Sequence, residues 1–295
     1  MIEKTVTEQK FDIYGVQICA KRWRTKHINN ELPVLQIVAL HGWLDNAASF
    51  DFILPFFDYA NLDVLSVDLA GHGLSTHRSG LSAYNIWSDV GEIHAVLKQI
   101  GWDKATFLGH SRGAMVATLY AGTFPEKVTS LVLIEAVEPQ TLEPEMLPKQ
   151  LAQSIEALPK LVNKKPRVHA TFDDAVKARQ KGLFHIPFDV AMAFAKRGVK
   201  KTEGGFCWGS DQKLLAPSEI KLSDAQSQAF FDNFPRQTLV ILGEYGLLDA
   251  DKKQRAKLEK QEALTCVTYN GDHHLHMTAD KVLFEKLRMK SKIIV

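Results

Sequence analysis

The sequence predicts an α/β fold in which a mostly parallel sheet, flanked by helices, is interrupted by a helical insertion. Three observations support this prediction. Short apolar runs of strand length alternate with helical patterns as far as Ile134. The alternation stops at Ala136 and returns at Thr238. Between these two points lie eight of the 11 prolines, and apolar residues recur there at helical spacing instead.

The first third of the chain predicts an edge or antiparallel strand, two buried strands and a long helix. Residues 16–23 alternate loosely between apolar and polar side chains. Residues 35–40 and 64–67 are mostly apolar, which is typical of strands covered on both faces. Residues 47–57, which lie between those strands, are expected to be helical. The long helix is indicated by apolar residues at steps of three and four: Ile86, Val90, Ile93, Leu97 and Ile100.

A strand, a helix and a second strand follow in close succession. Residues 105–108 and 128–134 predict the two buried strands, and residues 115–121 predict the helix, which Gly122 and Pro125 end. The helical spacing of the insertion is carried by Leu147, Leu151, Ile155 and Leu158. The remaining expected elements are strands at 238–242 and 265–269, a helix near 250–264 and a final helix from Ala279.

The break in the pattern divides the chain into two parts. We expect residues 1–135 and 236–295 to form the core domain, and residues 136–235 to form a helical cap or lid. An insertion that leaves the sheet near the carboxyl ends of parallel strands is well placed to cover a site.

The segment Gly109-His110-Ser111-Arg112-Gly113 is the most specific chemical signal of the sequence. It reads Gly-x-Ser-x-Gly between a predicted strand and a predicted helix, which is the context of a nucleophile at a sharp turn. Glycines leave room for the strained backbone of such a turn. The serine then lies at the positive end of a helix, where negative charge that develops in a reaction is stabilised.

The composition is that of an ordinary globular protein. Hydrophobic residues make up 45% and charged residues 24%, and the formal net charge is +2. No whole-chain basic surface predicts nucleic-acid binding, and no apolar run approaches the length of about 18 residues that indicates a membrane span. Residues 1–5 do not resemble a secretory signal, so we expect a cytoplasmic location. Eleven Lys and Arg against three Asp in residues 160–201 fit a solvated helical face better than a polyanion or membrane site.

The segment His41-Gly42-Trp43 follows a buried strand and is expected near Ser111. A tetrahedral intermediate needs two donors for its oxygen, and the backbone N–H groups of Trp43 and Arg112 are the candidates. His41, Gly42 and His110 are expected to line the pocket, with His41 serving as a hydrogen-bonding residue rather than as a base.

The loop Gly271-Asp272-His273-His274-Leu275-His276 supplies the candidate base. An imidazole has a pKa suited to taking the proton of a serine. His273 is the first candidate and His274 the alternative, whereas His276 is expected to be structural. The three histidines lack partners at metal-ligand spacing, so we expect neither a metal nor an organic cofactor.

Two carboxylates compete for the role of orienting the imidazole. Asp249 follows the predicted strand 238–242, and Glu135 follows the strand 128–134. Both come after the serine and before the histidine, so chain order does not decide between them. Asp249 could equally cap the helix that follows it. Asp68 and His72, in the glycine-containing loop after residues 64–67, are expected to anchor that loop.

Together these motifs resemble the α/β-hydrolase family, in particular its cap-bearing branch with haloalkane dehalogenases, epoxide hydrolases, small carboxylesterases and serine hydrolase-like proteins. The resemblance covers nearly the whole chain outside the insertion, and it implies an eight-stranded sheet. It rests on four segments: His41-Gly42-Trp43, residues 68–75 (Asp-x-x-Gly-x-Gly-x-Ser), residues 109–113 and Gly271-x-His273.

Two departures from the family pattern carry information. The usual acid position of the family is occupied here by Gly246, whereas a subset places its acid where this chain has Glu135, so the resemblance favours Glu135 over Asp249. The dehalogenases and epoxide hydrolases use an aspartate nucleophile, and residue 111 is serine. Arg112, beside the nucleophile, is expected to form a structural ion pair, with recognition of an anionic substrate as the alternative.

The sequence therefore predicts a serine hydrolase that cleaves carboxylic esters of small molecules through an acyl-enzyme intermediate. Ser111, His273 and Glu135 would be its catalytic residues. The alternatives are another hydrolase with the same triad (a C–C hydrolase, thioesterase or amidase) and a non-catalytic binder of small ligands. Neither a nucleic-acid partner nor stable membrane insertion is expected, and the oligomeric state is not predicted.

Overall fold

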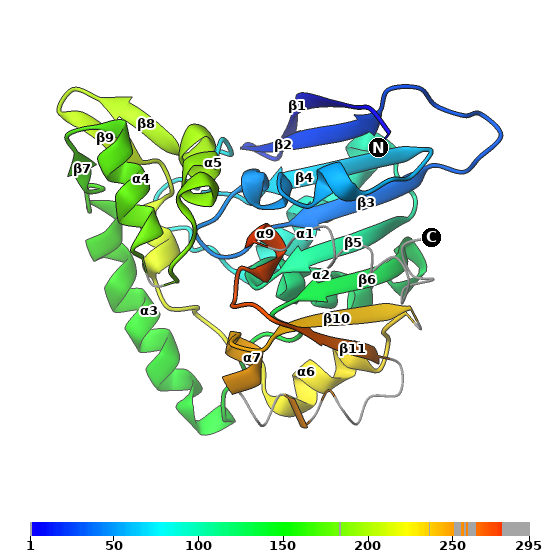
Figure 1. Cartoon of the computed structure of the whole chain (residues 1–295). Helices are drawn as coiled ribbons and strands as arrows, with labels where there is room; N and C mark the ends of the chain where they lie inside the picture. Colours follow the sequence, from blue (N-terminus) through cyan, green and yellow to red (C-terminus); the bar gives the residue numbers. More distant parts are fainter. Residues whose placement is uncertain are drawn as a thin grey trace.

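The sheet of the computed structural model has eight strands in the order β1-β2-β4-β3-β5-β6-β10-β11 (Figure 1). The structure describes residues 2–182, 184–235, 237–250, 255, 256, 258 and 264–278. The six strands from β4 to β11 run parallel, and β2 pairs antiparallel with both β1 and β4. The predicted mostly parallel sheet is thus confirmed. Its strands are β1 (Lys4–Ile13), β2 (Val16–Thr25), β3 (Leu35–Leu40), β4 (Leu62–Asp68), β5 (Ala105–His110), β6 (Val128–Ile134), β10 (Thr238–Gly243) and β11 (Leu264–Tyr269).

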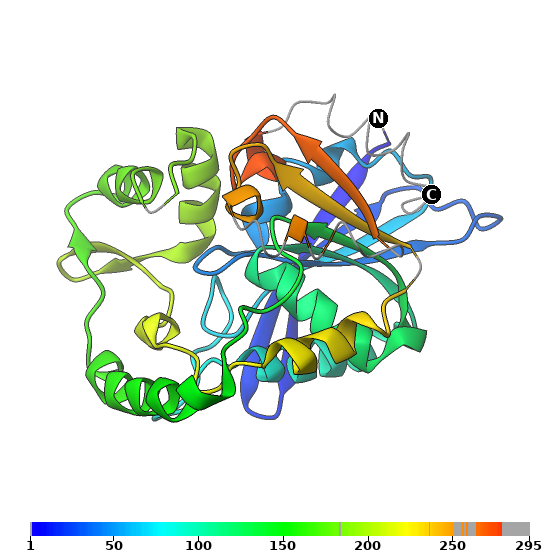
Figure 2. The same ribbon diagram turned by 90° about the horizontal axis from the view of Figure 1, so that it is seen from below.

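Helices cover both faces of this sheet (Figure 2). One face carries α1 (Ile86–Ile100), α2 (Arg112–Thr123) and α6 (Asp224–Phe231). The other carries the short helices η1 (Ala47–Phe50), η2 (Leu54–Phe56) and α9 (Leu275–Thr278). Successive strand residues point to opposite faces, so Leu133 joins the first core and Val132 the second. Because helices cover both faces of the sheet, the residues on both sides of each central strand are apolar, and the strands appear in the sequence as continuous apolar runs.

The expected helix at residues 47–57 is instead two separate 3₁₀ turns, η1 and η2. Asn46 caps the first turn, and Pro55 lies at the start of the second, where it cannot donate the hydrogen bond that a continuous helix requires. Of the helices expected at 250–264 and from Ala279, the first lies mostly and the second entirely outside the described residues. The described part of this region includes α7 (Leu247–Ala250).

The segment 136–235 contains strands as well as helices. Its helices are α3 (Leu147–Val162), α4 (Phe172–Gln180), α5 (Phe188–Gly198) and α6, and its short 3₁₀ turns include η4 (Pro144–Met146) and η5 (Gln212–Leu215). A three-stranded antiparallel sheet, which the sequence did not predict, joins β7 (Val168–His169), β9 (Gly205–Trp208) and β8 (Val199–Thr202).

Most of this segment lies beside the main sheet. α6 instead packs on the face of the sheet that also carries α1 and α2. α3, α4, α5 and the small sheet lie together at the left of Figure 1. They are joined to the main sheet through a third apolar cluster, in which Phe194 and Val176 pack with Ala48 and Met277. α6 packs against α2, since Phe230 lies directly above Gly122. No helix of the described part combines the length and apolarity that a bilayer crossing requires.

Candidate active site

Ser111 lies at a sharp turn between β5 and α2. Its backbone has φ 51° and ψ −116°, a region that side chains rarely adopt. The two glycines of the motif are required by close backbone contacts. A Cβ at Gly113 would overlap the carbonyl group of Leu40, and a Cβ at Gly109 would lie 2.5 Å from the Cα of Ala114. The sequence motif therefore forms the strained strand–turn–helix that it predicts.

Glu135 lies directly beyond β6, and its backbone is also in the left-handed region, with φ 59°. Its carboxylate is buried, at 2% exposure, and accepts hydrogen bonds from the backbone N–H of Gly243 at 2.6 Å and of Leu247 at 2.8 Å. Oε2 lies 3.3 Å from Nδ1 of His273. The structure thus brings together the carboxylate and the imidazole that the sequence proposed as partners.

Gly246 provides the space for this carboxylate. A Cβ on Gly246 would overlap both carboxylate oxygens of Glu135. Gly246 occupies the position at which the α/β-hydrolase family usually has its acid. Because it has no side chain, it leaves space for the carboxylate of Glu135, which follows the neighbouring strand β6. Asp249, the alternative acid, lies in α7, and its side chain is outside what the structure describes.

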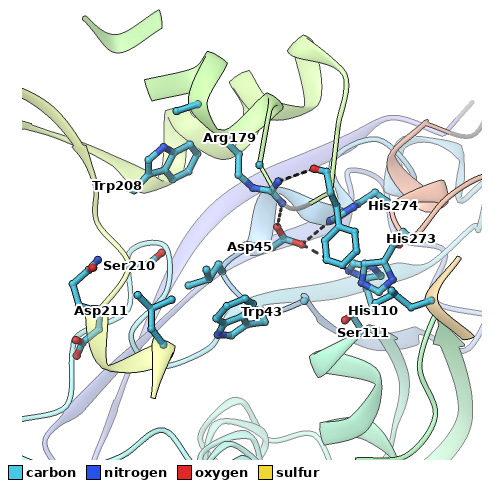
Figure 3. Close-up of a pocket in the computed structure, with 18 residues that line it drawn as sticks. Trp43, Asp45, His110, Ser111, Arg179, Trp208, Ser210, Asp211, His273 and His274 are labelled. Carbon is cyan, nitrogen blue, oxygen red and sulfur yellow. Dashed lines mark hydrogen bonds and ion pairs between the residues drawn. The ribbon is translucent and has the colours of Figure 1, made fainter. Parts of the chain in front are cut away.

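Ser111 and His273 line the same pocket and lie at the same end of it (Figure 3). Within the described residues the Ser111 hydroxyl forms no hydrogen bond, so the expected direct contact with the imidazole is not formed here. In active sites without substrate this contact is often loose and tightens when substrate binds. The His273 ring is held between Phe184 and His110, with ring centroids at 4.7 and 4.8 Å.

The pocket has a volume of about 550 Å³ and is formed by both the main sheet and the segment 136–235. Loops after the strands of the main sheet contribute Ser111, His273 and Trp43. The segment 136–235 contributes Phe184 and Trp208. Pockets of this size and aromatic character hold small organic molecules. The pocket lies over the nucleophile turn, as the predicted position of the insertion requires.

The two candidate oxyanion donors are backbone N–H groups without protein acceptors in the described part of the chain. Trp43 follows β3 and lines the pocket, and Arg112 is the first residue of α2, where the N–H has no partner in the helix.

His41 does not line the pocket, contrary to the expectation, because its ring is completely buried beneath it. Nδ1 donates to the carbonyl oxygen of Gly42 at 2.7 Å, and Nε2 accepts from the N–H of Leu69 at 3.1 Å. Burial lowers the pKa of His41, so the ring is neutral and holds two loops together.

Gly42 and His110 do line the pocket. Nε2 of His110 donates to the carbonyl oxygen of His273 at 2.8 Å and so fixes the backbone of the candidate base. Burial and the nearby rings of His276, His273 and His274 hold the pKa of His110 well below its usual range. A Cβ on Gly42 would lie 2.9 Å from Nδ1 of His110, which explains a glycine there.

Arg112 does not direct its side chain into the pocket. Its guanidinium donates to the buried carboxylate of Asp89 in α1 at 2.6 and 3.1 Å, and to the carbonyl oxygen of Tyr84 at 3.2 Å. It is therefore a structural ion pair, and recognition of an anionic substrate by Arg112 is excluded by this geometry.

The glycine loop after β4 is anchored as expected. The carboxylate of Asp68 accepts from the backbone N–H groups of Ala47 and Leu74 and from Arg197. His72 is buried, and its Nδ1 donates to the carbonyl oxygen of Ala70 at 3.0 Å. Both side chains hold loops in place rather than reach the pocket.

Asp45 and Arg179 line the pocket, and no motif of the sequence predicts them as residues of the site. Asp45 is buried behind the histidines, and its carboxylate accepts a hydrogen bond from Arg179 of α4 at 2.7 Å (Figure 3). Nε2 of His274 lies 3.5 Å from the same carboxylate, so His274 faces Asp45 rather than Glu135. His276 bonds Ser49 at 2.9 Å and is structural, as expected. The 134 positions between Arg179 and Asp45 leave no pattern from which to predict their pairing.

Comparison with known proteins places the chain in a family. Residues 36–280 match the family described as the alpha/beta hydrolase fold. Serine hydrolase-like protein 2 of Homo sapiens is 29% identical over 92% of this chain and 90% of its own length. A serine hydrolase-like protein of Dictyostelium discoideum is 25% identical over 89% of this chain and 75% of its own length.

Solved structures show the same fold. A hypothetical protein from Pseudomonas aeruginosa PAO1 is 32% identical, with a TM-score of 0.86 over 96% of both chains. A thioesterase domain from the curacin biosynthetic pathway superposes with a TM-score of 0.78 over 97% of this chain and 100% of its own, at 21% identity. The chain therefore belongs to the alpha/beta hydrolase family, and within that family it is similar to the serine hydrolase-like proteins.

Proposed function

We propose that this protein is a serine hydrolase that cleaves carboxylic esters of small molecules, with Ser111, His273 and Glu135 as its catalytic triad. The observation that carries the proposal is the 3.3 Å approach of the Glu135 carboxylate to Nδ1 of His273, at the pocket that Ser111 lines from a strained turn. Strain of this kind is common at active sites.

In this mechanism Nε2 of His273 accepts the Ser111 proton while Oγ attacks the ester carbonyl. The N–H groups of Trp43 and Arg112 stabilise the oxyanion, and Glu135 stabilises the imidazolium. His273 then protonates the leaving alcohol, and an acyl-enzyme forms. Water attacks this intermediate with the same histidine as base, which releases the acid and restores the serine. No step requires a metal or an organic cofactor.

Membership of the family supports a hydrolase, whereas the choice of ester is our inference from the site. The thioesterase domain that shares this fold acts, by its name, on thioesters. Thioesters and amides therefore belong in the panel that tests the proposal.

The experiment compares wild-type protein with Ser111→Ala on short 4-nitrophenyl esters, the matching thioesters and anilides, and on a fluorophosphonate probe. We expect the wild type to hydrolyse the esters fastest and to be labelled covalently. Ser111→Ala should lose both properties, because the serine oxygen forms the covalent bond.

Faster turnover of thioesters or anilides would replace the ester assignment with one of the other triad hydrolases. A folded wild-type protein that neither turns over substrate nor reacts with the probe would be a non-catalytic binder. Circular dichroism of both proteins confirms that the fold is intact in either case.

A further inference from the structure

The pocket has charged residues in its wall, and each of them is already paired within the protein. Arg179 donates to Oδ1 of Asp45 at 2.7 Å and to the carbonyl oxygen of Phe184 at 3.4 Å. The Arg179 side chain is 16% exposed and that of Asp45 1%. Figure 3 shows the pair in the wall, with Arg179 beyond Asp45 as seen from the nucleophile.

Asp211, the other carboxylate of the wall, is paired in the same way. Oδ2 accepts from the hydroxyl of Tyr84 at 2.6 Å, and Oδ1 accepts from the backbone N–H of Lys213 at 3.0 Å. Nζ of Lys213 lies 3.7 Å from Oδ2, and Nδ1 of His77 lies 3.8 Å from it. A substrate ammonium group would have to displace these partners.

The aromatic residues of the wall also present no polar group. Nε1 of Trp43 donates to the carbonyl oxygen of Leu214 at 2.9 Å, and Nε1 of Trp208 donates to that of Ala175 at 3.1 Å. Both indoles therefore turn their N–H groups toward the backbone and offer the cavity only ring surfaces. Phe184 adds a third aromatic ring.

We propose that the Asp45–Arg179 ion pair determines the specificity of this pocket by masking two opposite charges. The pocket then takes neutral, mainly aromatic or aliphatic substrate groups and discriminates against carboxylate and ammonium groups. This inference rests on the function proposed above, because it names the class of substrate that the same site accepts.

Two physical arguments support the masking. Charges that approach closely in a partly buried site interact strongly, so a substrate ion competes poorly with the resident partner. Burial raises the pKa of Asp45, but the hydrogen bond with His274 and the charge of Arg179 outweigh it and hold the pKa well below its usual range. Asp45 is thus ionised and neutralises Arg179.

The test uses binding rather than turnover. In the Ser111→Ala background we titrate three probes of similar size, phenylacetamide, phenylacetate and 2-phenylethylamine, and follow tryptophan fluorescence. We expect the neutral amide to bind at least about tenfold more tightly than either ion. All three titrations are made at one pH, at which phenylacetate is an anion and 2-phenylethylamine a cation. His274 and His110, which also face Asp45, are common to the three measurements.

Two variants unmask the two charges separately. Asp45→Asn should raise the affinity for phenylacetate relative to the amide by about 10- to 100-fold, because the charge of Arg179 becomes available. Arg179→Gln should shift the preference toward the amine instead. Because the two shifts have opposite signs, neither can result from a general loosening of the pocket.

Arg197→Gln is the matched control. Arg197 forms a second buried ion pair with Asp68, at 2.9 Å, and neither residue lines the pocket. This variant should lower stability and leave the order of the three probes unchanged. If Asp45→Asn changes that order no more than Arg197→Gln does, or if the amide does not bind, the inference is wrong. A lack of ester turnover would instead contradict the proposed function and leave these affinities measurable.

Discussion

At the scale of single residues, the relation between Glu135 and Gly246 explains the position of the candidate acid. The carboxylate of Glu135 fills the volume that a side chain at residue 246 would occupy. Two backbone N–H groups hold both of its oxygens, which fixes its orientation toward His273. An acid at one of these positions therefore excludes an acid at the other.

The first prediction separates the two candidate acids. Glu135→Gln should reduce kcat for 4-nitrophenyl acetate by about 10³–10⁴-fold, because the imidazole loses the carboxylate that orients it and stabilises its charged form. Asp249→Asn should stay near the wild-type rate. Steady-state kinetics of both variants measure this, and a large loss in Asp249→Asn with none in Glu135→Gln would reverse the assignment.

The second prediction moves the acid to the other strand. Glu135→Gly removes the carboxylate and relieves the left-handed backbone at that position, where φ is 59°. We expect the single variant to be inactive and the double variant Glu135→Gly, Gly246→Asp to recover at least about tenfold in kcat, because the new carboxylate enters the vacated volume. Equal rates for the single and double variants would show that a carboxylate placed in this volume is not sufficient to restore catalysis.

The nucleophile turn, the two candidate acids and His273 were identifiable from sequence because each follows an apolar strand. The preference for Glu135 over Asp249 came from the family resemblance. Parallel strands bring such positions to one edge of the sheet, so order along the chain indicates proximity in space. Asp45 and Arg179 carry no such signal. Their contact depends on how α4 packs against the main-sheet part of the molecule. That packing involves residues distant in the chain, so no local sequence pattern indicates it.

At the scale of elements, the buried strands of the main sheet and the helices α1, α2 and α3 were predicted, whereas β1, the individual helices α4 to α6 and the short strands were not. β5, α2 and β6 follow the apolar pattern closely. β7, β8 and β9 have two to four residues each, too few to establish an alternation, and they read as loops between helices. The helix expected at residues 47–57 was wrong because a proline interrupts it.

The third prediction concerns α1, which carries Asp89 and Glu92 one turn apart. Glu92 faces Arg78 and is mostly buried, and Arg112 binds Asp89. Burial raises the pKa of Glu92 to about 7, and the charge of Asp89 adds to this increase, although Arg78 opposes it. The folded state therefore holds this proton more tightly than the unfolded chain, in which the pKa is about 4.3.

Because the pKa of Glu92 is raised in the folded state, its contribution to stability is complete below about pH 4.3. That contribution is lost as the pH rises through about 7. We expect the wild type to lose on the order of 3–4 kcal/mol of unfolding free energy from this group over that interval, because each unit of pKa corresponds to about 1.4 kcal/mol. Glu92→Gln should flatten the dependence, as measured by urea unfolding at several pH values. Glu156→Gln, on the exposed side of α3, is the control, and an unchanged slope in Glu92→Gln would contradict the assignment.

At the scale of the whole molecule, two partly buried arginines join the segment 136–235 to the main sheet. Arg179 of α4 reaches Asp45, and Arg197 of α5 reaches Asp68 as well as Glu8 of β1. Each pair lies beside an apolar contact, so the position of the pocket wall is fixed by packing and by charge together. The pocket therefore depends on contacts that are distant from the nucleophile.

The fourth prediction tests how strongly one of these pairs holds the molecule together. Arg197 is 7% exposed at its side chain and Asp68 is fully buried, so Arg197→Gln leaves a carboxylate in the interior with only the N–H groups of Ala47 and Leu74. Removing one partner of a buried ion pair costs more than the pair itself contributes, because the remaining charge stays desolvated. We expect a loss of about 2–4 kcal/mol in the free energy of urea unfolding.

The control for this prediction is Lys26→Gln, which removes an ion pair with Glu3 at the surface. Both side chains of that pair are exposed and well solvated, so its loss should not change stability measurably. The comparison separates burial from charge, because both variants replace one cation by a neutral amide. If the two variants unfold at the same urea concentration, Asp68 finds other partners in the folded state, and the attachment of α5 to the sheet depends on the apolar cluster around Phe194 alone.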